Sequence, residues 1–272
     1  MRSIGPRETR DLLDRHGLRP RTSIGQHFVT DPNTVRKMVR IAEVSSGDQV
    51  LEVGPGLGAL SVALVGAGAR LIAIERDRAL EPVLAEVLPS ATVVFGDALQ
   101  VEVRGLLRRR PTRFVANLPY QIATPLLMRL LVERPEIRSY TVMVQREVGE
   151  RLAARPGTDA YGAVSAKVAY LGEARVAARV SRKVFYPMPD VESVIVRIDR
   201  RSRPPVGGGR ERIFRVIEAG FAQRRKTIRN TLRAVWPTAA VEEALTRAGI
   251  DPGARAETLG LESFAALARA LP

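Results

Sequence analysis

Short runs of aliphatic and β-branched residues alternate with amphipathic segments through the middle of the chain. We expect strands at residues 49–53, 70–74, 92–95, 113–116 and 140–144, and helices at residues 61–66, 78–88, 124–133 and 148–154. This alternation predicts a parallel, Rossmann-like α/β sheet with helices on both faces. Two further runs, 176–180 and 193–198, have no helix between them, so at least one of them should be antiparallel.

The turn after the first predicted strand is rich in glycine. Strand 49–53 leads into Gly54-Pro55-Gly56-Leu57-Gly58, with the acidic Glu52 two positions before the first glycine. Ligands of doubly wound sheets bind beyond the carboxyl ends of the strands, where small residues let them approach the backbone. Dehydrogenases prefer G-x-G-x-x-G for a pyrophosphate. The G-x-G-x-G spacing argues against a dinucleotide oxidoreductase and is the pattern of S-adenosylmethionine sites.

The next two strand ends carry carboxylates. Glu75 ends strand 70–74 and could accept hydrogen bonds from both hydroxyls of a ribose. Asp97 follows strand 92–95, next to Ala98, and could accept from an adenine amine. Either residue alone is more often a helix cap or a solvated turn. Their positions at successive strand ends, in the order expected for the parts of a cofactor, favour a cofactor site.

The fourth strand ends in Asn117-Leu118-Pro119-Tyr120. Enzymes that methylate an exocyclic amine of a nucleobase use this kind of sequence. An Asn oxygen and a backbone carbonyl can each accept one N–H of the amine, which frees its delocalised lone pair. Pro119 has no N–H and fixes the turn, and Tyr120 offers a face for stacking. Alone, the motif could equally be a strand followed by a proline turn.

Composition narrows the class of partner. The chain has 43 basic and 29 acidic residues and a net charge of +14, which favours a polyanion. Only four of the basic residues are Lys, a bias that codon usage could produce. Residues 200–233 nevertheless hold eleven basic and two acidic side chains, so nucleic acid is favoured over a membrane surface or a solvated face.

The chain has no Cys and two His, which argues against disulfides and against a metal site. The N-terminus lacks the apolar core of a signal peptide. The uncharged run 53–69 contains five Gly and one Pro, so it is not expected to span a membrane. We therefore expect a cytoplasmic protein that acts without a membrane.

The chain is expected to divide into two domains. Residues 1–202 should form the sheet domain, with 1–22 as a mobile basic arm that carries a short helix around residues 8–16. Residues 203–210, rich in Pro and Gly, should be a linker. Residues 211–272 should form a small helical domain for RNA or ribosome binding, with helices at 212–236, 238–249 and 262–271.

Taken together, these motifs resemble the ribosomal RNA small-subunit adenine dimethyltransferases of the KsgA (RsmA) type. The resemblance covers nearly the whole chain. It is carried by residues 25–28, 52–58 and 117–120, and most specifically by Phe185-Tyr186-Pro187-Met188-Pro189-Asp190-Val191-Glu192-Ser193 and Phe221-Ala222-Gln223-Arg224-Arg225-Lys226-Thr227-Ile228-Arg229-Asn230. It implies a class I S-adenosylmethionine methyltransferase sheet followed by a small all-helical domain.

The resemblance also implies the reaction. Two methyl groups would be transferred to N6 of each of two adjacent adenosines, in the hairpin near the 3′ end of 16S rRNA in a pre-30S particle. S-adenosyl-L-methionine would be the donor and S-adenosyl-L-homocysteine the product. The family implies a role in small-subunit biogenesis and in kasugamycin sensitivity, and a monomeric enzyme is expected.

The resemblance assigns the site residues as well. The cofactor would contact His27, Val29, Gly54, Gly56, Glu75, Asp97, Ala98 and Asn117. Asn117, Leu118, Pro119 and Tyr120 would be catalytic, and Tyr120 and Phe185 would stack on the flipped adenine. Arg224, Arg225, Lys226 and Arg229 are the candidate RNA contacts; on one continuous helix, Arg225 and Arg229 would be one turn apart.

Two positions depart from the family pattern. Where the family usually has Asn this chain has His27, and Val29 stands where Leu is common. Neutral His can donate from one ring nitrogen and accept at the other, so a cofactor contact can survive. His27 could also merely cap a turn. Phe185, beside two prolines, could instead be a plug in the core.

Two other functions remain open at this point. A macrolide-resistance methylase acting on large-subunit rRNA would share the fold and a similar Asn-x-Pro-Tyr motif. A non-catalytic assembly or transcription factor of the same lineage would share the fold but would not need residues 117–120. Leu118 and residues 223–230 argue against the first function. The intact Asn117, Pro119 and Tyr120 argue against the second.

Overall fold

We analysed a computed structural model of the protein, which describes residues 3–22, 25–107 and 112–272. Seven strands form one sheet in the order β4 (Thr92–Phe95), β3 (Arg70–Glu75), β2 (Gln49–Val53), β5 (Thr112–Asn117), β6 (Ile137–Gln145), β9 (Ser193–Arg200) and β7 (Gly172–Val180). The pairs among β4, β3, β2, β5 and β6 are parallel, and β9 runs antiparallel to β6. The predicted α/β class and its antiparallel strand are confirmed.

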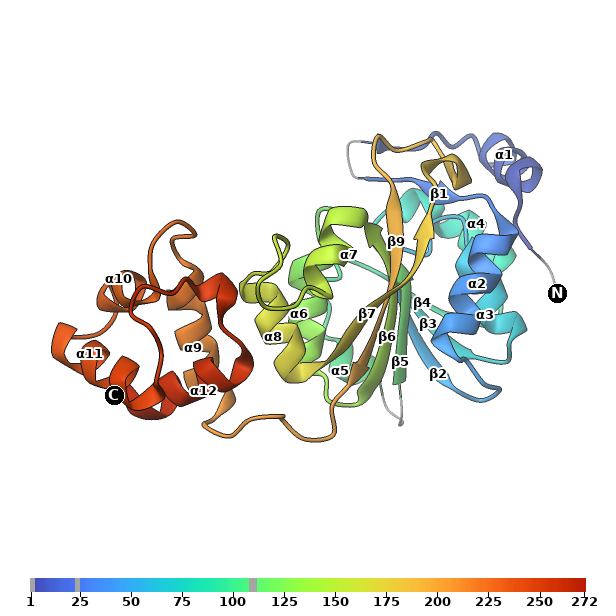
Figure 1. The fold of residues 1–272 in the computed structure, drawn as a ribbon. Coiled ribbons are helices and arrows are strands. Elements are labelled where there is room, and N and C mark those ends of the chain that lie inside the picture. Colours follow the sequence, from blue (N-terminus) through green and yellow to red (C-terminus); the bar gives the residue numbers. More distant parts are fainter. Residues whose placement is uncertain (1–2, 23–24, 108–111) are drawn as a thin grey trace. The chain divides into compact units, whose positions relative to one another are not determined.

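Helices cover both faces of this sheet (Figure 1). The helices α2 (Pro32–Ala42), α3 (Ala59–Gly66) and α4 (Glu81–Val87) lie on one face, and α6 (Ala123–Glu133) lies on the other. Helix α2 begins with residue types that commonly start a helix. The Asp31 carboxylate accepts hydrogen bonds from the Asn33 and Thr34 amides at 3.1 and 2.9 Å, and Pro32 occupies the first turn.

The register of the parallel strands brings their carboxyl ends together. Val53 pairs with Ile74, and Glu75 pairs with Phe95. The Gly54 amide donates to the Ile74 carbonyl at 2.9 Å, and the Gly96 amide donates to the Glu75 carbonyl at 2.8 Å. The loops that follow β2, β3 and β4 therefore lie together at one edge of the sheet.

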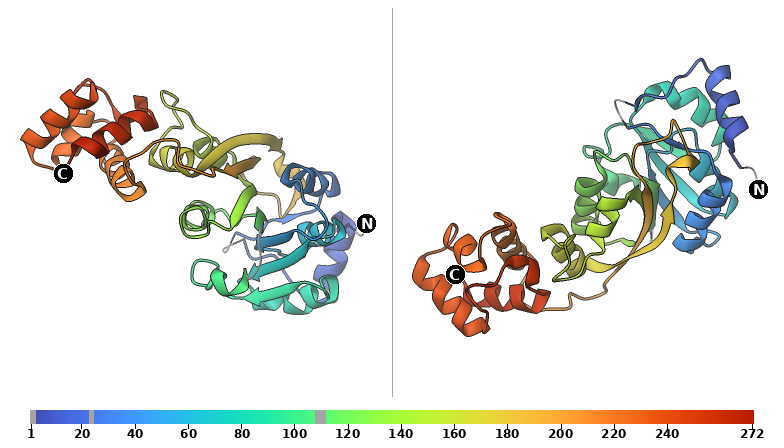
Figure 2. Two further views of the ribbon diagram at one scale, coloured as in Figure 1. Left: turned by 90° about the horizontal axis from the view of Figure 1, so that it is seen from below. Right: turned by 45° about the horizontal axis from the view of Figure 1, so that its top comes forward.

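A second, two-stranded sheet joins segments that are far apart in the sequence. Strand β1 (Phe28–Val29) pairs antiparallel with β8 (Phe185–Tyr186), so that Val29 faces Phe185 in register. The two views of Figure 2 show the blue N-terminal segment beside the yellow-orange segment before β9. Such short strands are not predicted from the sequence. They bring the segment 27–29 and Phe185 to the same place.

The N-terminal segment packs against the sheet domain, which corrects the expectation of a mobile arm. Helix α1 (Pro6–Arg15) buries Leu12 and Leu13, and Ile4 before it is also buried. His16 lies beyond the helix, with its Nε2 2.9 Å from the Glu86 carboxylate. The aliphatic residues at positions 4, 12 and 13 are the reason, because their burial removes apolar surface from water. Residues 1 and 2 of the expected arm lie outside the described residues.

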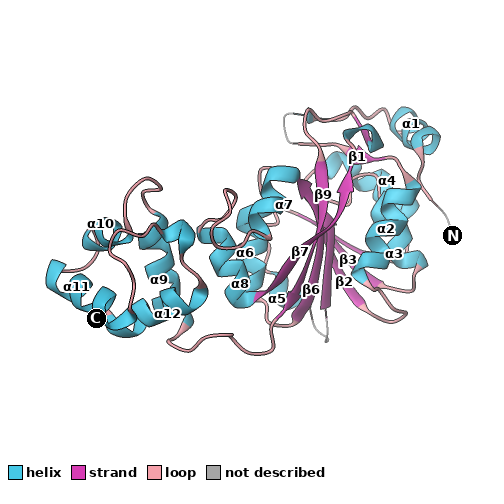
Figure 3. Cartoon of the chain, viewed as in Figure 1, coloured by secondary structure: helices cyan, strands magenta, loops and turns pink. Residues whose placement is uncertain are grey.

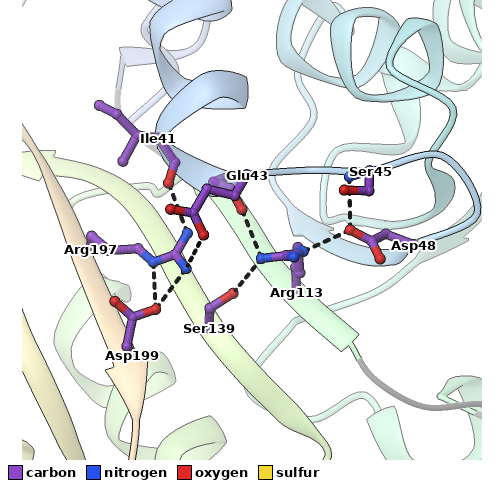
Figure 4. A network of polar contacts seen from close by, with 9 residues as sticks. Ile41, Glu43, Ser45, Asp48, Arg113, Ser139, Arg197 and Asp199 are labelled. Atoms are coloured by element: carbon purple, nitrogen blue, oxygen red, sulfur yellow. Dashed lines mark hydrogen bonds and ion pairs between the residues drawn. The ribbon is translucent and has the colours of Figure 1, made fainter.

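A polar network fixes the end of α2 to the strands β5 and β9 (Figure 4). Arg197, only 4% exposed, donates to the Ile41 carbonyl at 2.8 Å and to the Asp199 carboxylate at 2.7 Å. Arg113 donates to Asp48 at 2.7 Å and to the Ala42 carbonyl at 3.0 Å. Both guanidinium groups therefore satisfy carbonyl groups that the end of the helix leaves unpaired.

The chain divides into two compact units, residues 1–149 with 175–200, and residues 150–174 with 201–272. The second unit thus takes in residues 150–174, which we had expected to belong to the sheet domain. Its helices are α8 (Ala163–Leu171), α9 (Arg210–Phe221), α10 (Ile228–Arg233), α11 (Thr238–Ala248) and α12 (Leu261–Ala270). Figure 3 shows only helices and loops over residues 201–272. Tyr161 and Phe221 pack edge to face within this unit, at a centroid distance of 5.7 Å.

The remaining helices are short. They are α5 (Val103–Leu106), α7 (Arg146–Leu152) and the 3₁₀ turns Arg78–Leu80, Arg182–Val184 and Ala256–Thr258.

The predicted continuous helix 212–236 is wrong. Helix α9 ends at Phe221, a turn covers residues 222–227, and α10 begins at Ile228. Thr227 caps α10 by accepting from the Asn230 amide, and the Ile228 amide donates to the Ala254 carbonyl at 2.7 Å. The second bond uses the Ile228 amide, which a continuous helix would need for its own bond to the carbonyl four residues earlier. The helical propensity of residues 222–227 does not predict this contact.

Candidate active site

A cavity of about 1140 Å³, open solvent at its mouth included, lies at the carboxyl ends of β2, β3, β4 and β5. All its lining residues belong to the first compact unit. The predicted residues that line it are His27, Val29, Gly54, Gly56, Glu75, Asp97, Ala98, Asn117, Leu118, Pro119, Tyr120 and Phe185. The sequence prediction and the geometry thus converge on one cavity.

The glycines of the turn after β2 are required by both conformation and space. Gly54 and Gly56 have φ angles of +73° and +58°, in the left-handed region that side chains disfavour. A Cβ on Gly56 would lie 2.9 Å from the Phe28 ring, and one on Gly54 would lie 3.3 Å from Pro119. The turn therefore brings bare backbone to the wall of the cavity.

Two carboxylates stand at the ends of β3 and β4. Glu75 is buried, and each of its oxygens accepts one backbone N–H, from Asp77 at 2.8 Å and from Gly56 at 3.2 Å. Burial raises the pKa of Glu75 above its usual value. Asp97 Oδ1 accepts from the Leu99 amide at 2.9 Å. Each carboxylate oxygen has a second lone pair, so both residues can accept further hydrogen bonds from a ligand.

Asn117 and His27 are joined through a backbone contact. Asn117 Nδ2 donates to the His27 carbonyl at 3.3 Å. His27 Nδ1 lies 2.8 Å from the Pro187 carbonyl, which can only accept, so the proton is on Nδ1. In the neutral ring Nε2 then carries a lone pair. The resulting chain of contacts orients the Asn117 amide and leaves its Oδ1 as an acceptor.

Aromatic side chains form another part of the cavity wall. The Tyr120 ring stacks on the His27 ring at 5.8 Å with an interplanar angle of 25°, and its hydroxyl lies 3.2 Å from Ser193 Oγ. Burial raises the pKa of Tyr120 above its usual value, so the hydroxyl stays protonated at neutral pH. Phe185 is 5% exposed and contributes to the same wall from β8.

Two polar residues that line this cavity, Gln26 and Glu52, belong to the sequence motifs but were assigned no contact with a ligand. Glu52 is 1% exposed, and burial raises its pKa to about 8; Ser61 opposes this shift, although neither Glu52 Oε2 nor Ser61 Oγ makes a hydrogen bond of good geometry. Gln26 Nε2 donates to Asp77 Oδ2 at 2.8 Å, and Arg21 Nη1 donates to Asp77 Oδ1 at 3.2 Å. The spacing of residues in the sequence does not predict these contacts of Arg21 and Gln26 with Asp77.

The four basic residues predicted to bind RNA belong to the second unit, and they differ in their partners. Arg224 contacts the Asp159 carbonyl at 2.8 Å, and Arg229 binds both carboxylate oxygens of Glu242 at 3.0 and 3.3 Å. Arg225 and Lys226 are exposed in the turn before α10, with no ion pair to any residue in the described ranges. Two of the four cations, Arg225 and Lys226, are therefore available to contact a ligand.

The fold and the cavity define a class I S-adenosylmethionine-type methyltransferase architecture. Two solved structures resemble it over most of its length: the 23S rRNA methyltransferase ErmE (29% identity, TM-score 0.71, covering 90% of this chain and 99% of that one) and a dimethyladenosine transferase from Plasmodium falciparum (25% identity, TM-score 0.74, covering 89% and 96%).

Residues 17–271 match the family model of the ribosomal RNA adenine dimethylases, and the chain belongs to that family. It is 46% identical to the "Ribosomal RNA small subunit methyltransferase A" of Thermobifida fusca, over 100% of this chain and 97% of that protein. It is 48% identical to the protein of the same name from Moorella thermoacetica, over 98% and 97%. The predicted family is confirmed.

Among the helices that the structure describes, none is long and apolar enough to cross a membrane.

Proposed function

We propose that the cavity binds S-adenosyl-L-methionine and that the chain dimethylates N6 of two adjacent adenosines near the 3′ end of 16S rRNA. The observation that carries the proposal is the orientation of Asn117 in a cavity that Glu75 and Asp97 also line. The relatives that are 46–48% identical are named as small-subunit rRNA methyltransferases, which favours this rRNA over the large-subunit one.

The residues present fit the cofactor. The bare backbone at Gly54 and Gly56 allows close approach, and Glu75 has lone pairs left for two ribose hydroxyls. Asp97 would accept from the adenine amine beside Ala98. His27 and Val29 would close the cavity from the N-terminal segment. When bound, the cofactor supplies an electrophilic methyl group, and S-adenosyl-L-homocysteine is the product.

The motif at the end of β5 would hold the target amine. Asn117 Oδ1 accepts one N–H of the amine, since Nδ2 is already committed to the His27 carbonyl. The Leu118 carbonyl accepts the other N–H: within the described residues no backbone amide donates to it, and the Ile122 amide donates to Pro119 instead. These two bonds free the nitrogen lone pair and align it, and alignment contributes much of the rate. The nitrogen loses its proton to solvent once it is cationic.

The aromatic side chains would hold the flipped base. Tyr120 is kept in place by its contacts with His27 and Ser193, and Phe185 is fixed by the β1–β8 pairing. Extruding a base costs a few kcal/mol, which stacking on these two rings offsets in part. Phe185 belongs to the buried core cluster and also lines the cavity, and the second observation supports this role.

The basic turn of the second unit would contact RNA phosphates. Arg225 and Lys226 are the primary candidates because they are exposed and free of ion pairs in the described chain, and Arg224 and Arg229 would add charge beside them. Arg225→Glu with Lys226→Glu should weaken binding to the subunit and flatten its dependence on salt, by about one unit of slope per lost phosphate contact. Arg247→Glu, exposed in the same unit, is the matched control. An unchanged slope would remove the turn from the interface.

The same proposal covers the partner and the setting of the reaction. The substrate is the rRNA of an assembling small subunit, and the proposed substrate implies a cytoplasmic enzyme. Action as a monomer is part of the same proposal.

The decisive experiment is methylation of undermethylated small ribosomal subunits with S-adenosylmethionine, followed by mass-spectrometric mapping of the modified adenosines. We expect two adjacent N6,N6-dimethyladenosines near the 3′ end of 16S rRNA. Naked large-subunit rRNA, incubated in parallel, tests the ErmE-like alternative. Binding to the subunit with no methyl transfer would instead identify a non-catalytic factor.

A further inference from the structure

Exposed apolar side chains gather in one loop beside the cavity. Among the described residues, five large hydrophobic side chains are exposed, and three of these lie within six consecutive residues. They are Tyr186 at 45%, Met188 at 53% and Val191 at 43%. A single exposed apolar side chain needs no explanation, but a cluster of them is typical of a surface that binds a partner.

The loop holds these side chains in defined positions. Tyr186 pairs with Phe28 across the two-stranded sheet, and the Thr30 amide donates to the Val184 carbonyl at 2.8 Å. The Pro187 carbonyl accepts from His27 Nδ1 at 2.8 Å. Pro189 is buried. Tyr186 and Met188 are therefore exposed on an anchored backbone, so little conformational entropy is lost when a ligand covers them.

This surface continues from the site proposed for the target base. Phe185, which lines the cavity, directly precedes Tyr186. Because successive side chains of a strand point to opposite faces, Phe185 points into the cavity while Tyr186 points outward from its rim. His27, which holds Pro187, also lines the cavity.

The charges beside the loop favour RNA as the occupant. Arg179, Arg182 and Lys183 are exposed just before β8, and none of their side chains forms an ion pair with a residue that the structure describes. Asp190 and Glu192 are exposed on the other side of the apolar residues, and Glu192 accepts from the Arg182 amide. Flat or flexible apolar side chains next to free cations suit a base and its phosphate.

We propose that Tyr186 and Met188 form a stacking platform for the nucleotide next to the target adenosine. The inference rests on the proposed function. When one adenosine of an adjacent pair occupies the cavity, its neighbour remains covalently attached at the rim, where Tyr186 and Met188 are exposed. The platform positions the RNA and takes no part in the chemistry, so it affects recognition of the substrate more than turnover.

The test uses the full chain, undermethylated small subunits and the variants Tyr186→Ala, Met188→Ala and the double variant. A stacked base contributes about 1–3 kcal/mol, so KM for the subunit should rise roughly 5- to 150-fold in the double variant. The kcat and the affinity for S-adenosylmethionine should change little. Tyr186→Trp should restore KM. Val176→Ala, on β7 and 40% exposed, is the matched control and should behave as wild type.

Chemical probing of the rRNA in the complex identifies the occupant. With the wild-type protein the nucleotides that flank the target adenosine should be protected, and with the double variant they should become reactive. If KM rises but the protection is unchanged, a ribosomal protein covers the surface and the platform is refuted. If all three variants match Val176→Ala, the platform is refuted while the function stands. If the wild type transfers no methyl group to the subunit, the proposed function itself fails.

Discussion

The amide nitrogen of Asn117 lies 3.3 Å from the carbonyl oxygen of His27 and donates a hydrogen bond to it. This bond joins the end of β5 to a segment 90 residues earlier in the chain. It also selects which end of the Asn117 amide faces the cavity, because the Nδ2 group is already used. Under the proposed function, the acceptor for the target amine would therefore be set before any substrate arrives, which is the condition for preorganised catalysis.

Replacing Asn117 with Ala should lower the rate of methyl transfer by about 10²- to 10³-fold, as expected when one preorganised polar contact is removed. The rate is measured under single turnover with saturating cofactor. Circular dichroism and thermal unfolding check that the variant is folded. A folded Asn117→Ala with wild-type turnover would refute the assigned role.

Replacing Glu75 with Ala should weaken S-adenosylmethionine binding by about 1–3 kcal/mol, the cost of leaving polar partners unpaired. Calorimetry measures the affinity directly. Glu81→Ala is the control, since Glu81 is 57% exposed on α4 and lies outside the cavity. Equal affinities for the two variants would remove Glu75 from the ribose site.

Position 27 should tolerate Asn better than Ala. The Ala variant loses the donor to the Pro187 carbonyl, and one such bond contributes about 0.5–1.5 kcal/mol, so KM for the subunit should rise roughly 2- to 13-fold. Asn keeps a donor and should lie between Ala and wild type. Steady-state kinetics with small subunits distinguishes the three proteins. A His27→Ala variant with unchanged KM would assign this contact no part in substrate binding.

Glu52 should make stability depend on pH. Its pKa is raised by burial from 4.5 to about 8, so between these values the native state holds a proton that the unfolded state has lost. The free energy of unfolding should therefore fall as the pH rises from 4.5 to 8 and level off above that. Glu52→Gln, which resembles the protonated form, should reduce the slope by as much as about 1.4 kcal/mol per pH unit.

Urea unfolding of wild type and Glu52→Gln at pH 5.5 and 7.5 measures the effect. The difference in pH dependence between the two proteins isolates the contribution of Glu52 from that of Glu75, whose pKa is also raised. Parallel slopes for both proteins would show that Glu52 is ionised in the folded state.

Replacing Arg197 with Met should destabilise the fold by about 1–3 kcal/mol, because the Ile41 carbonyl loses its buried donor. Chemical denaturation gives the value. Arg7→Met is the control: Arg7 is 96% exposed, and its ion pair with Asp11 is worth at most a few tenths of a kcal/mol. If the two variants lose the same stability, the network in Figure 4 contributes no more than a surface pair.

The sequence alone determined the sheet and the edge at which the cavity lies. Strand periodicity is a local property, and residues at the ends of parallel strands must meet at one edge, so Gly54, Glu75, Asp97 and Asn117 could be placed together. The same reasoning predicted that at least one of the runs 176–180 and 193–198 would be antiparallel, and β9 is the strand that runs antiparallel to β6.

Only the tertiary structure decided the contacts between distant segments. The pairing of β1 with β8, the bond from His27 to Pro187 and the packing of α1 each join residues far apart in the sequence, and short strands carry no periodic signal. The helix predicted over residues 212–236 is interrupted where the Ile228 amide donates to the Ala254 carbonyl instead of to a carbonyl of the same helix. Local propensity fixes which elements can form, whereas the pairing of buried polar groups decides where they end and which loops they hold.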